Sequence, residues 1–177
     1  MTAPASLPAR VHAAAHLTGE FVLRSGQVSH EYFDKYRFEA DPALLAEITE
    51  GLAGLLADDA ELVAGLELGG IPLATMLSQR TGRPARFVRK EAKAYGTAEL
   101  AEGGPVAGRR LAVVEDVVTS GGQVVASCED LRARGAEVVQ VLCVIDREAG
   151  GPEALAAAGL TLTPLFRASE LRAAASA

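Results

Sequence analysis

The chain has 177 residues, of which 49% are hydrophobic, and a formal net charge of −6. This length suits one compact domain and is short for two. The negative charge argues against nonspecific nucleic-acid binding, which requires a broad basic surface. No apolar run approaches the roughly 20 residues of a membrane helix, and the N-terminal stretch lacks the pattern of a signal peptide. We therefore expect a single cytoplasmic domain over residues 1–177 that binds neither nucleic acid nor membrane.

The N-terminal part of the chain is predicted to contain two helices with two extended segments between them. In the second extended segment, aromatic and polar residues alternate as in a strand through Tyr32, Asp34 and Tyr36. Asp41 is expected to cap the second helix, with Pro42 at its first position. In chain order, the elements are a helix over 8–17, extended segments over 19–26 and 29–38, and a helix over 41–57.

From residue 62 onward, short apolar runs alternate with helical patterns. Apolar runs that are nearly continuous indicate strands buried on both faces, and their alternation with helices indicates a parallel sheet. We therefore predict a doubly wound α/β fold with a mainly parallel sheet, in which ligands bind at the carboxyl ends of the strands. The expected strands are 62–68, 85–90, 109–116 and 137–147, the expected helices are 72–82 and 122–135, and a last strand and a short helix capped near Ser169 follow.

The segment "LAVVEDVVTSGGQ", residues 111–123, combines two acids with a turn rich in hydroxyls and glycines. A helix that starts after this turn offers unpaired N–H groups, and Thr119 and Ser120 add donors, so this half predicts a phosphate site. Glu115 and Asp116, at the carboxyl edge of the expected strand, would repel phosphate. They can accept hydrogen bonds from ribose hydroxyls and stabilise a positive charge on the ring. An ordinary acid pair before a capped helix would explain either half alone, but both halves together predict a ribose 5-phosphate site.

This segment resembles the phosphoribosyl pyrophosphate (PRPP) motif of the type I phosphoribosyltransferases, in which two acids and a Thr/Gly-rich turn follow hydrophobic residues. The resemblance implies the fold of that superfamily, with a small N-terminal hood over residues 1–40 and a mobile catalytic loop over 91–108. Within the segment it implies PRPP contacts from Glu115, Asp116, Val117, Val118, Thr119, Ser120, Gly121, Gly122 and Gln123.

A second stretch, "FVRKEAKAYGT", is similar to the mobile catalytic loop of orotate phosphoribosyltransferases. Arg89, Lys90 and Lys93 match the cations of that loop, which bind pyrophosphate, and Lys93 is implied to be catalytic together with the two acids. Tyr95 stands where a His is commoner in that family. Its phenol can still donate a hydrogen bond to the donor substrate.

Two further matches point to orotate as the acceptor. "LRSGQVSHEYFD" resembles the N-terminal signature of the same family, in which an aromatic pair, here Tyr32 and Phe33, contacts the orotate ring, and Arg24 stands where a Lys is frequent. Arg147 matches the Arg that pairs with the orotate carboxylate, and Thr119 is expected near the base. A guanidinium fork suits a carboxylate, which purines lack.

The resemblance implies transfer of ribose 5-phosphate from PRPP to orotate in pyrimidine biosynthesis. Mg²⁺ is expected to be carried by substrate oxygens, since no cluster of acids suggests a full protein cage. A homodimer that shares the catalytic loop between subunits is implied as well. Two alternatives stay open at this point. A purine phosphoribosyltransferase would keep the PRPP motif, whereas a non-catalytic PRPP sensor would need a basic DNA-binding module, which the residues before Asp41 do not supply.

Overall fold

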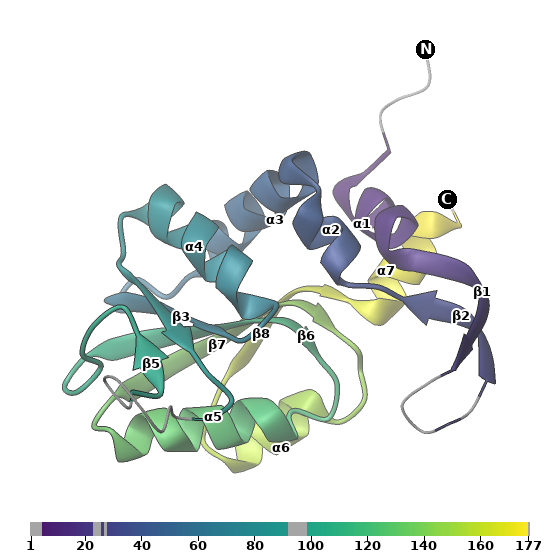
Figure 1. Ribbon diagram of the computed structural model, residues 1–177. Helices are drawn as coiled ribbons and strands as arrows, with labels where there is room; N and C mark the ends of the chain where they lie inside the picture. The colour runs from purple at the N-terminus through teal and green to yellow at the C-terminus, as the bar shows by residue number, and fades with distance from the viewer. Residues whose placement is uncertain (1–4, 23–25, 27, 92–98, 177) are drawn as a thin grey trace.

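The computed structural model describes residues 5–22, 26, 28–91 and 99–176. Its centre is a six-stranded sheet with strand order β5-β4-β3-β6-β7-β8 (Figure 1). Every neighbouring pair is parallel except β4 and β5, which are antiparallel. The strands are β3 (Leu62–Leu66), β4 (Ala85–Val88), β5 (Ala101–Glu102), β6 (Arg110–Val118), β7 (Glu137–Asp146) and β8 (Leu162–Arg167).

Helices cover both faces of this sheet, which confirms the predicted doubly wound fold (Figure 1). On β6, Leu111 and Val113 pack into the core beneath α5 and α6, whereas Ala112 and Val114 pack into the core beneath α3 and α4. Successive strand residues point to opposite faces, so a strand buried on both faces needs apolar residues throughout. The helices are α1 (Leu7–Ala15), α2 (Tyr36–Ala40), α3 (Pro42–Leu55), α4 (Gly70–Thr81), α5 (Gly122–Ala133), α6 (Gly151–Ala157) and α7 (Ala168–Ala175).

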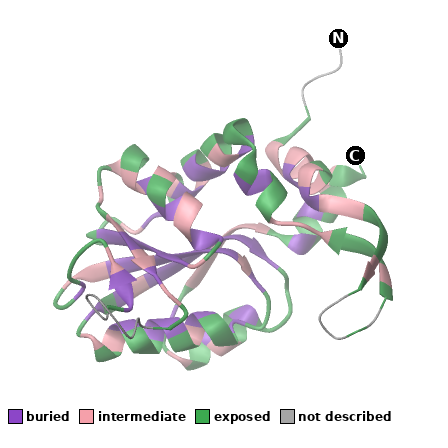
Figure 2. Cartoon of the chain, viewed as in Figure 1, coloured by how far each residue is buried: buried purple, intermediate pink, exposed green. Residues whose placement is uncertain are grey.

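A two-stranded antiparallel hairpin, β1 (His16–Val22) and β2 (Val28–Phe33), extends from the end of α1 beyond the main sheet (Figure 1). Most of its residues are exposed or only partly buried (Figure 2). Two expectations for this region were wrong. The first helix ends at Ala15 rather than at residue 17, and Tyr36 lies in helix α2 rather than in an extended segment. Tertiary packing explains the second error, because α2 places Phe38 in the core with no exposed surface.

Several element boundaries follow the sequence signals. The Oδ1 atom of Asp41 accepts hydrogen bonds from the backbone N–H groups of Ala43 and Leu44, which caps α3 as predicted. Gly82, with φ of 71°, ends α4 in a left-handed conformation that favours glycine. The start of α7 differs from the prediction: Arg167, rather than a residue near Ser169, is its N-cap.

Part of the connection between β4 and β6 is packed structure. Leu100, Ala101 and Val106 are buried, and β5 pairs with β4. The guanidinium of Arg86 donates hydrogen bonds to the carbonyl oxygens of Pro105 and Ala85. Residues 99–108 are therefore held against the sheet, so this part of the predicted mobile loop over 91–108 is packed. For residues 91–98 the loop stays a prediction, because all of them except residue 91 lie outside the described residues. The short elements β5 and α6 were not predicted, because neither is long enough to show a periodic pattern.

Both cysteines are free and buried, as their apolar neighbours indicate. Among the helices of the described residues, none is long and apolar enough to cross a membrane.

Candidate active site

A cavity of about 380 Å³ lies at the carboxyl ends of β3 and β6, where the fold predicts a ligand site. We call it the β6 cavity. Its lining comes from the start of α2 and the residue before it, the turn after β3, one residue after β4, the end of β6 with the turn that follows, and the start of α5. The lining residues are Lys35, Tyr36, Glu67, Leu68, Lys90, Glu115, Val117, Val118, Thr119, Ser120, Gly121, Gly122, Gln123 and Val124.

The two acids of β6 lie inside the strand rather than at its edge, because the strand continues to Val118. This corrects the predicted end of the strand at residue 116. Their carboxyls are in contact with each other, and the backbone N–H of Asp116 donates to Glu115 Oε1 at 2.9 Å. Glu115 lines the β6 cavity, whereas the side chain of Asp116 is completely buried and does not line it.

The carboxylate of Asp116 is held by the ammonium group of Lys35, whose Nζ lies 2.9 Å from Oδ1 and 2.6 Å from Oδ2. The backbone N–H of Val117 also donates to Oδ1, at 2.5 Å. Burial by itself would raise the pKa of Asp116, but the hydrogen bonds with Glu115 and Lys35 hold it below its usual value. Asp116 is therefore the ionised acid of the pair.

The pKa values of Glu115 and Glu39 shift in the opposite direction, above the usual value of a carboxyl. Burial raises the pKa of Glu115, and its hydrogen bond with Asp116 raises it further. Burial also raises the pKa of Glu39 on α2, and the charge of Asp116 adds to the effect. Two neighbouring carboxyls in a low-dielectric site cannot both be ionised without a large cost. The directions of these shifts place the negative charge of the cluster on Asp116, beside the ammonium of Lys35.

The turn after β6 has the features of an anion site. Gly121, with φ of 78°, is the N-cap of the 12-residue helix α5, and a Cβ at this position would lie 2.6 Å from Leu155 Cδ1. A Cβ at Gly122 would meet nothing within 4 Å, so the backbone there is open to a ligand. Thr119 and Ser120 are exposed at the same turn. The free N–H groups and the positive end of the α5 dipole thus face the β6 cavity together with two hydroxyl groups.

Arg89 and Lys90, two of the cations expected in the catalytic loop, lie in different surroundings in the structure. Lys90 lines the β6 cavity, and its backbone N–H donates to Glu67 Oε1 at 2.8 Å. Arg89 does not line the cavity: its Nε lies 3.3 Å from Oε1 of Glu102 on β5. Lys93 and Tyr95 lie outside the described residues.

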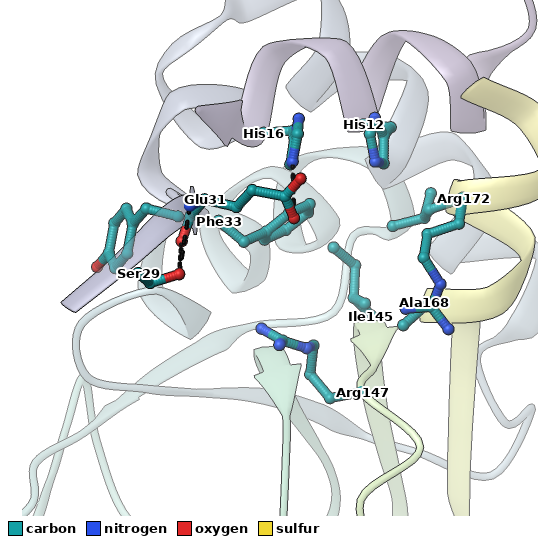
Figure 3. A pocket seen from close by; sticks show the side chains of 11 residues that line it. His12, His16, Ser29, Glu31, Phe33, Ile145, Arg147, Ala168 and Arg172 are labelled. Atoms are coloured by element: carbon teal, nitrogen blue, oxygen red, sulfur yellow. Dashed lines mark hydrogen bonds and ion pairs between the residues drawn. The ribbon is translucent and has the colours of Figure 1, made fainter. Parts of the chain in front are cut away.

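A second cavity, of about 430 Å³, lies between the hairpin, α1, α7 and the end of β7, and we call it the hairpin cavity (Figure 3). Tyr32, Phe33 and Arg147 all line it, so the structure brings together three of the residues expected at the base. The guanidinium carbon of Arg147 lies 5.9 Å from the centre of the Phe33 ring. Thr119 lines the β6 cavity instead, and Arg24 lies outside the described residues.

The two cavities lie at neighbouring strand ends, those of β6 and β7. These strands are paired through Val118 and Asp146, and the backbone N–H of Arg147 donates to the carbonyl oxygen of Val118 at 2.8 Å. Thr119, in one cavity, and Arg147, in the other, are therefore the next residues along two neighbouring strands. A ligand at the turn after β6 and a ligand at Arg147 would lie side by side.

Comparison with known proteins is consistent with this geometry. Residues 37–160 match the model of the phosphoribosyl transferase domain. An orotate phosphoribosyltransferase from a Nocardioides species is 54% identical over all 177 residues of this chain, and the match covers 99% of that enzyme's own length. The chain belongs to the orotate phosphoribosyltransferase family. Another orotate phosphoribosyltransferase, from Methanocella arvoryzae, is 42% identical over 86% of this chain and 87% of its own.

Solved structures of the family superpose closely on this chain. The crystal structure of Mycobacterium tuberculosis orotate phosphoribosyltransferase in complex with Fe(III) dicitrate has a TM-score of 0.84 and 36% identity, with 93% of this chain and 96% of that chain covered. The same enzyme in complex with PRPP has a TM-score of 0.80 and 32% identity, with 94% and 96% covered. The adenine phosphoribosyltransferase of Thermoanaerobacter pseudethanolicus, at 19% identity and a TM-score of 0.71, shares the fold.

Several residues in or beside the two cavities were not expected from the sequence. Lys35 lies in the segment over 29–38, whose aromatic alternation indicated a strand, and Glu39 follows it directly, so their approach to Asp116 could not be foreseen. His12 and His16 line the hairpin cavity with their rings stacked 4.9 Å apart. Their spacing of four residues, which places two side chains on the same face of a helix, was the available signal. Arg172, on α7, completes this side of the cavity.

Proposed function

We propose that the β6 cavity binds PRPP and that the hairpin cavity binds orotate. As an orotate phosphoribosyltransferase, the chain transfers ribose 5-phosphate from PRPP to orotate, which gives orotidine 5′-monophosphate and pyrophosphate. The observation that carries the assignment is the adjacency of the two cavities. Thr119 and Arg147 follow paired positions on β6 and β7, so a ribose 5-phosphate on one side and a carboxylated base on the other would be neighbours.

On the donor side, the turn from Thr119 to Gly122 would bind the 5-phosphate, with Val117, Val118 and Gln123 shaping the wall around it. Glu115 lines the cavity where the ribose would lie. Because Glu115 is protonated at neutral pH, it can both donate a hydrogen bond to a ribose hydroxyl and accept one.

Breaking the bond between the anomeric carbon and pyrophosphate leaves positive charge on the ribose ring. The charge of Asp116 lies beneath the cavity in a buried environment, where electrostatic stabilisation is stronger than in water. We assign to Asp116 the stabilisation of this charge and to Glu115 the orientation of the ring.

The leaving pyrophosphate would be bound by Lys90, together with Lys93, Arg89 and the phenol of Tyr95. Lys90 already lines the cavity, whereas Arg89 would have to leave Glu102 to reach it. These cations would neutralise charge that develops on the leaving group.

Mg²⁺ would supply further charge neutralisation when it arrives with PRPP. Within the described ranges, no group of three His, Cys, Asp or Glu side chains could hold a metal ion by itself. The described residues therefore fit an ion that is held mainly by substrate oxygens. Glu67, which accepts a hydrogen bond from the backbone N–H of Lys90, is the cavity carboxylate beside that lysine.

On the acceptor side, Arg147 would pair with the orotate carboxylate, and the rings of Phe33 and Tyr32 would contact the pyrimidine. Arg24 is expected to assist from the N-terminal signature. We further propose that the chain acts as a homodimer, with the catalytic loop shared between the two subunits.

One assay tests the proposed function. The purified chain is mixed with PRPP, Mg²⁺ and either orotate or a panel of purines, and loss of the base is followed by absorbance. We expect consumption of orotate with equimolar release of pyrophosphate, and no reaction with purines. In Arg147→Met, the KM for orotate should rise at least about tenfold, because a bidentate charged contact is lost. Turnover of a purine, or PRPP binding without any turnover, would contradict the proposal.

A further inference from the structure

Lys35 connects the hairpin to the β6 cavity. It follows Phe33, the last residue of β2, by two positions and precedes α2 directly. Its side chain is 34% exposed and lines the cavity, and its Nζ lies 5.3 Å from the centre of the Tyr36 ring. The same ammonium binds the buried carboxylate of Asp116. Lys35 therefore has one side towards the cavity and the other towards the acid.

This position prevents a ligand from reaching Asp116 directly. Asp116 has no exposed surface, and Gly69 lies so close to it that a Cβ there would come 1.6 Å from Oδ2. Among the described residues that line the cavity, Lys35 is the cation that contacts this carboxylate. A ribose hydroxyl could hydrogen-bond to Asp116 only by taking the place of the Lys35 ammonium.

The charge of the donor makes such a replacement favourable. PRPP carries a phosphate and a pyrophosphate, and the cavity must balance these charges. Among the described residues that line the β6 cavity, Lys35 and Lys90 are the cationic side chains, and Glu67 is an acid beside Lys90. An ammonium released from Asp116 would remain in the cavity, on a flexible four-carbon stem and among anionic oxygens.

We propose that Lys35 is a donor-binding residue that exchanges partners. In the free enzyme it neutralises Asp116. When PRPP binds, a ribose hydroxyl takes over the Asp116 carboxylate, and the ammonium binds an anionic oxygen of PRPP. This inference rests on the proposed function, since it assumes that the β6 cavity holds PRPP.

The test measures PRPP binding by titration calorimetry, with Mg²⁺, for the wild type, Lys35→Met, Lys35→Arg and Arg37→Met. Arg37 is the matched control, because it is an exposed cation in the same segment and lies outside both cavities. We expect Lys35→Met to weaken PRPP binding about 10- to 100-fold, as for the loss of a charged hydrogen bond. Lys35→Arg should recover most of the affinity, Arg37→Met should keep all of it, and the KM for orotate should change little.

Removal of Lys35 leaves Asp116 buried without its counter-ion, so a second comparison guards against misfolding. Lys35→Met/Asp116→Asn lacks both charges, and it is compared with Asp116→Asn alone. Partner exchange predicts that the double variant binds PRPP about tenfold or more weakly than the single one. Equal affinities would show that Lys35 is only the counter-ion of Asp116 and would overturn the inference. A wild type that does not bind PRPP would instead refute the proposed function.

Discussion

At the scale of single residues, the acids of "EDVVTSGG" do not act as two equal charges. Burial keeps the proton on Glu115, whereas Lys35 keeps Asp116 ionised, so the two carboxyls offer different chemistry at one place. One can exchange hydrogen bonds with sugar hydroxyls, and the other supplies a buried negative charge. The position of Asp116 in turn depends on Gly69, because the carboxylate of Asp116 occupies the space that a side chain at residue 69 would need.

Substitution of Gly69 tests this dependence. In Gly69→Ala, the new methyl group would lie 1.6 Å from Asp116 Oδ2, so either the turn or the acid must shift. We expect a loss of about 1–3 kcal/mol in the free energy of unfolding, as for overpacking, and at least a tenfold loss of turnover. Urea unfolding and steady-state kinetics measure the two effects.

Gly54→Ala is the control for this substitution. Gly54 lies in helix α3, and a Cβ there would meet nothing within 4 Å. Alanine favours the helix over glycine, so this variant should be more stable by about 0.5–1 kcal/mol and fully active. A Gly69→Ala variant that behaves like Gly54→Ala would refute the close contact with Asp116.

At the scale of elements, a single buried guanidinium helps to hold residues 99–108 against the sheet. Arg86 is 6% exposed, and burial lowers its pKa. It donates to Pro105 O from two nitrogen atoms and to Ala85 O from a third. These bonds hold the end of the connection close to β4, and therefore bound the length of chain that can act as a catalytic loop.

Removal of this guanidinium should destabilise the domain. In Arg86→Met, the carbonyl oxygens of Pro105 and Ala85 lose their donor, and we expect a loss of about 1–3 kcal/mol in the free energy of unfolding by urea. The matched control is Arg80→Met, because Arg80 pairs with Glu50 on the surface, where ion pairs contribute about 0–1 kcal/mol. Equal effects of the two substitutions would contradict the anchoring role of Arg86.

At the scale of the whole molecule, the proposed dimer with shared loops has a sharp consequence. Lys93→Ala should be nearly inactive because it lacks a loop cation, and Arg147→Met should be nearly inactive at low orotate. In a mixed dimer with shared loops, the Lys93→Ala subunit receives an intact loop from its partner. One of the two sites is then complete, and an equimolar mixture should recover about a quarter of the wild-type activity.

The recovery is measured after the two variants are unfolded together and refolded, and sedimentation checks that dimers form. Each variant refolded alone is the control. If the loop acts within its own subunit, the mixture should show no gain over the separate variants. A monomeric wild type would contradict the dimer itself.

Much of this architecture was predictable because it depends on local patterns. The apolar runs of β6 and β7, the cap at Asp41 and the turn at Gly121 each require particular residues at fixed spacing, whatever the rest of the chain does. The order of the PRPP motif likewise placed Thr119 and Ser120 at a helix start. Such signals depend on backbone hydrogen bonding and on residue alternation, which the sequence displays directly.

The assignment of charges depended on the tertiary structure. Lys35 and Asp116 are 81 positions apart, and their contact exists only because the fold brings the residue before α2 to the end of β6. The pKa values of Glu39 and Glu115 follow from burial and from that contact, and Arg89 is bound to Glu102 because β5 pairs with β4. The fold class, the family and the glycine-rich turn after β6 were thus readable from the residue pattern alone. Only the folded chain decided which acid is ionised, which cation lines the cavity, and how close the two cavities lie, because burial and long-range contacts set these properties.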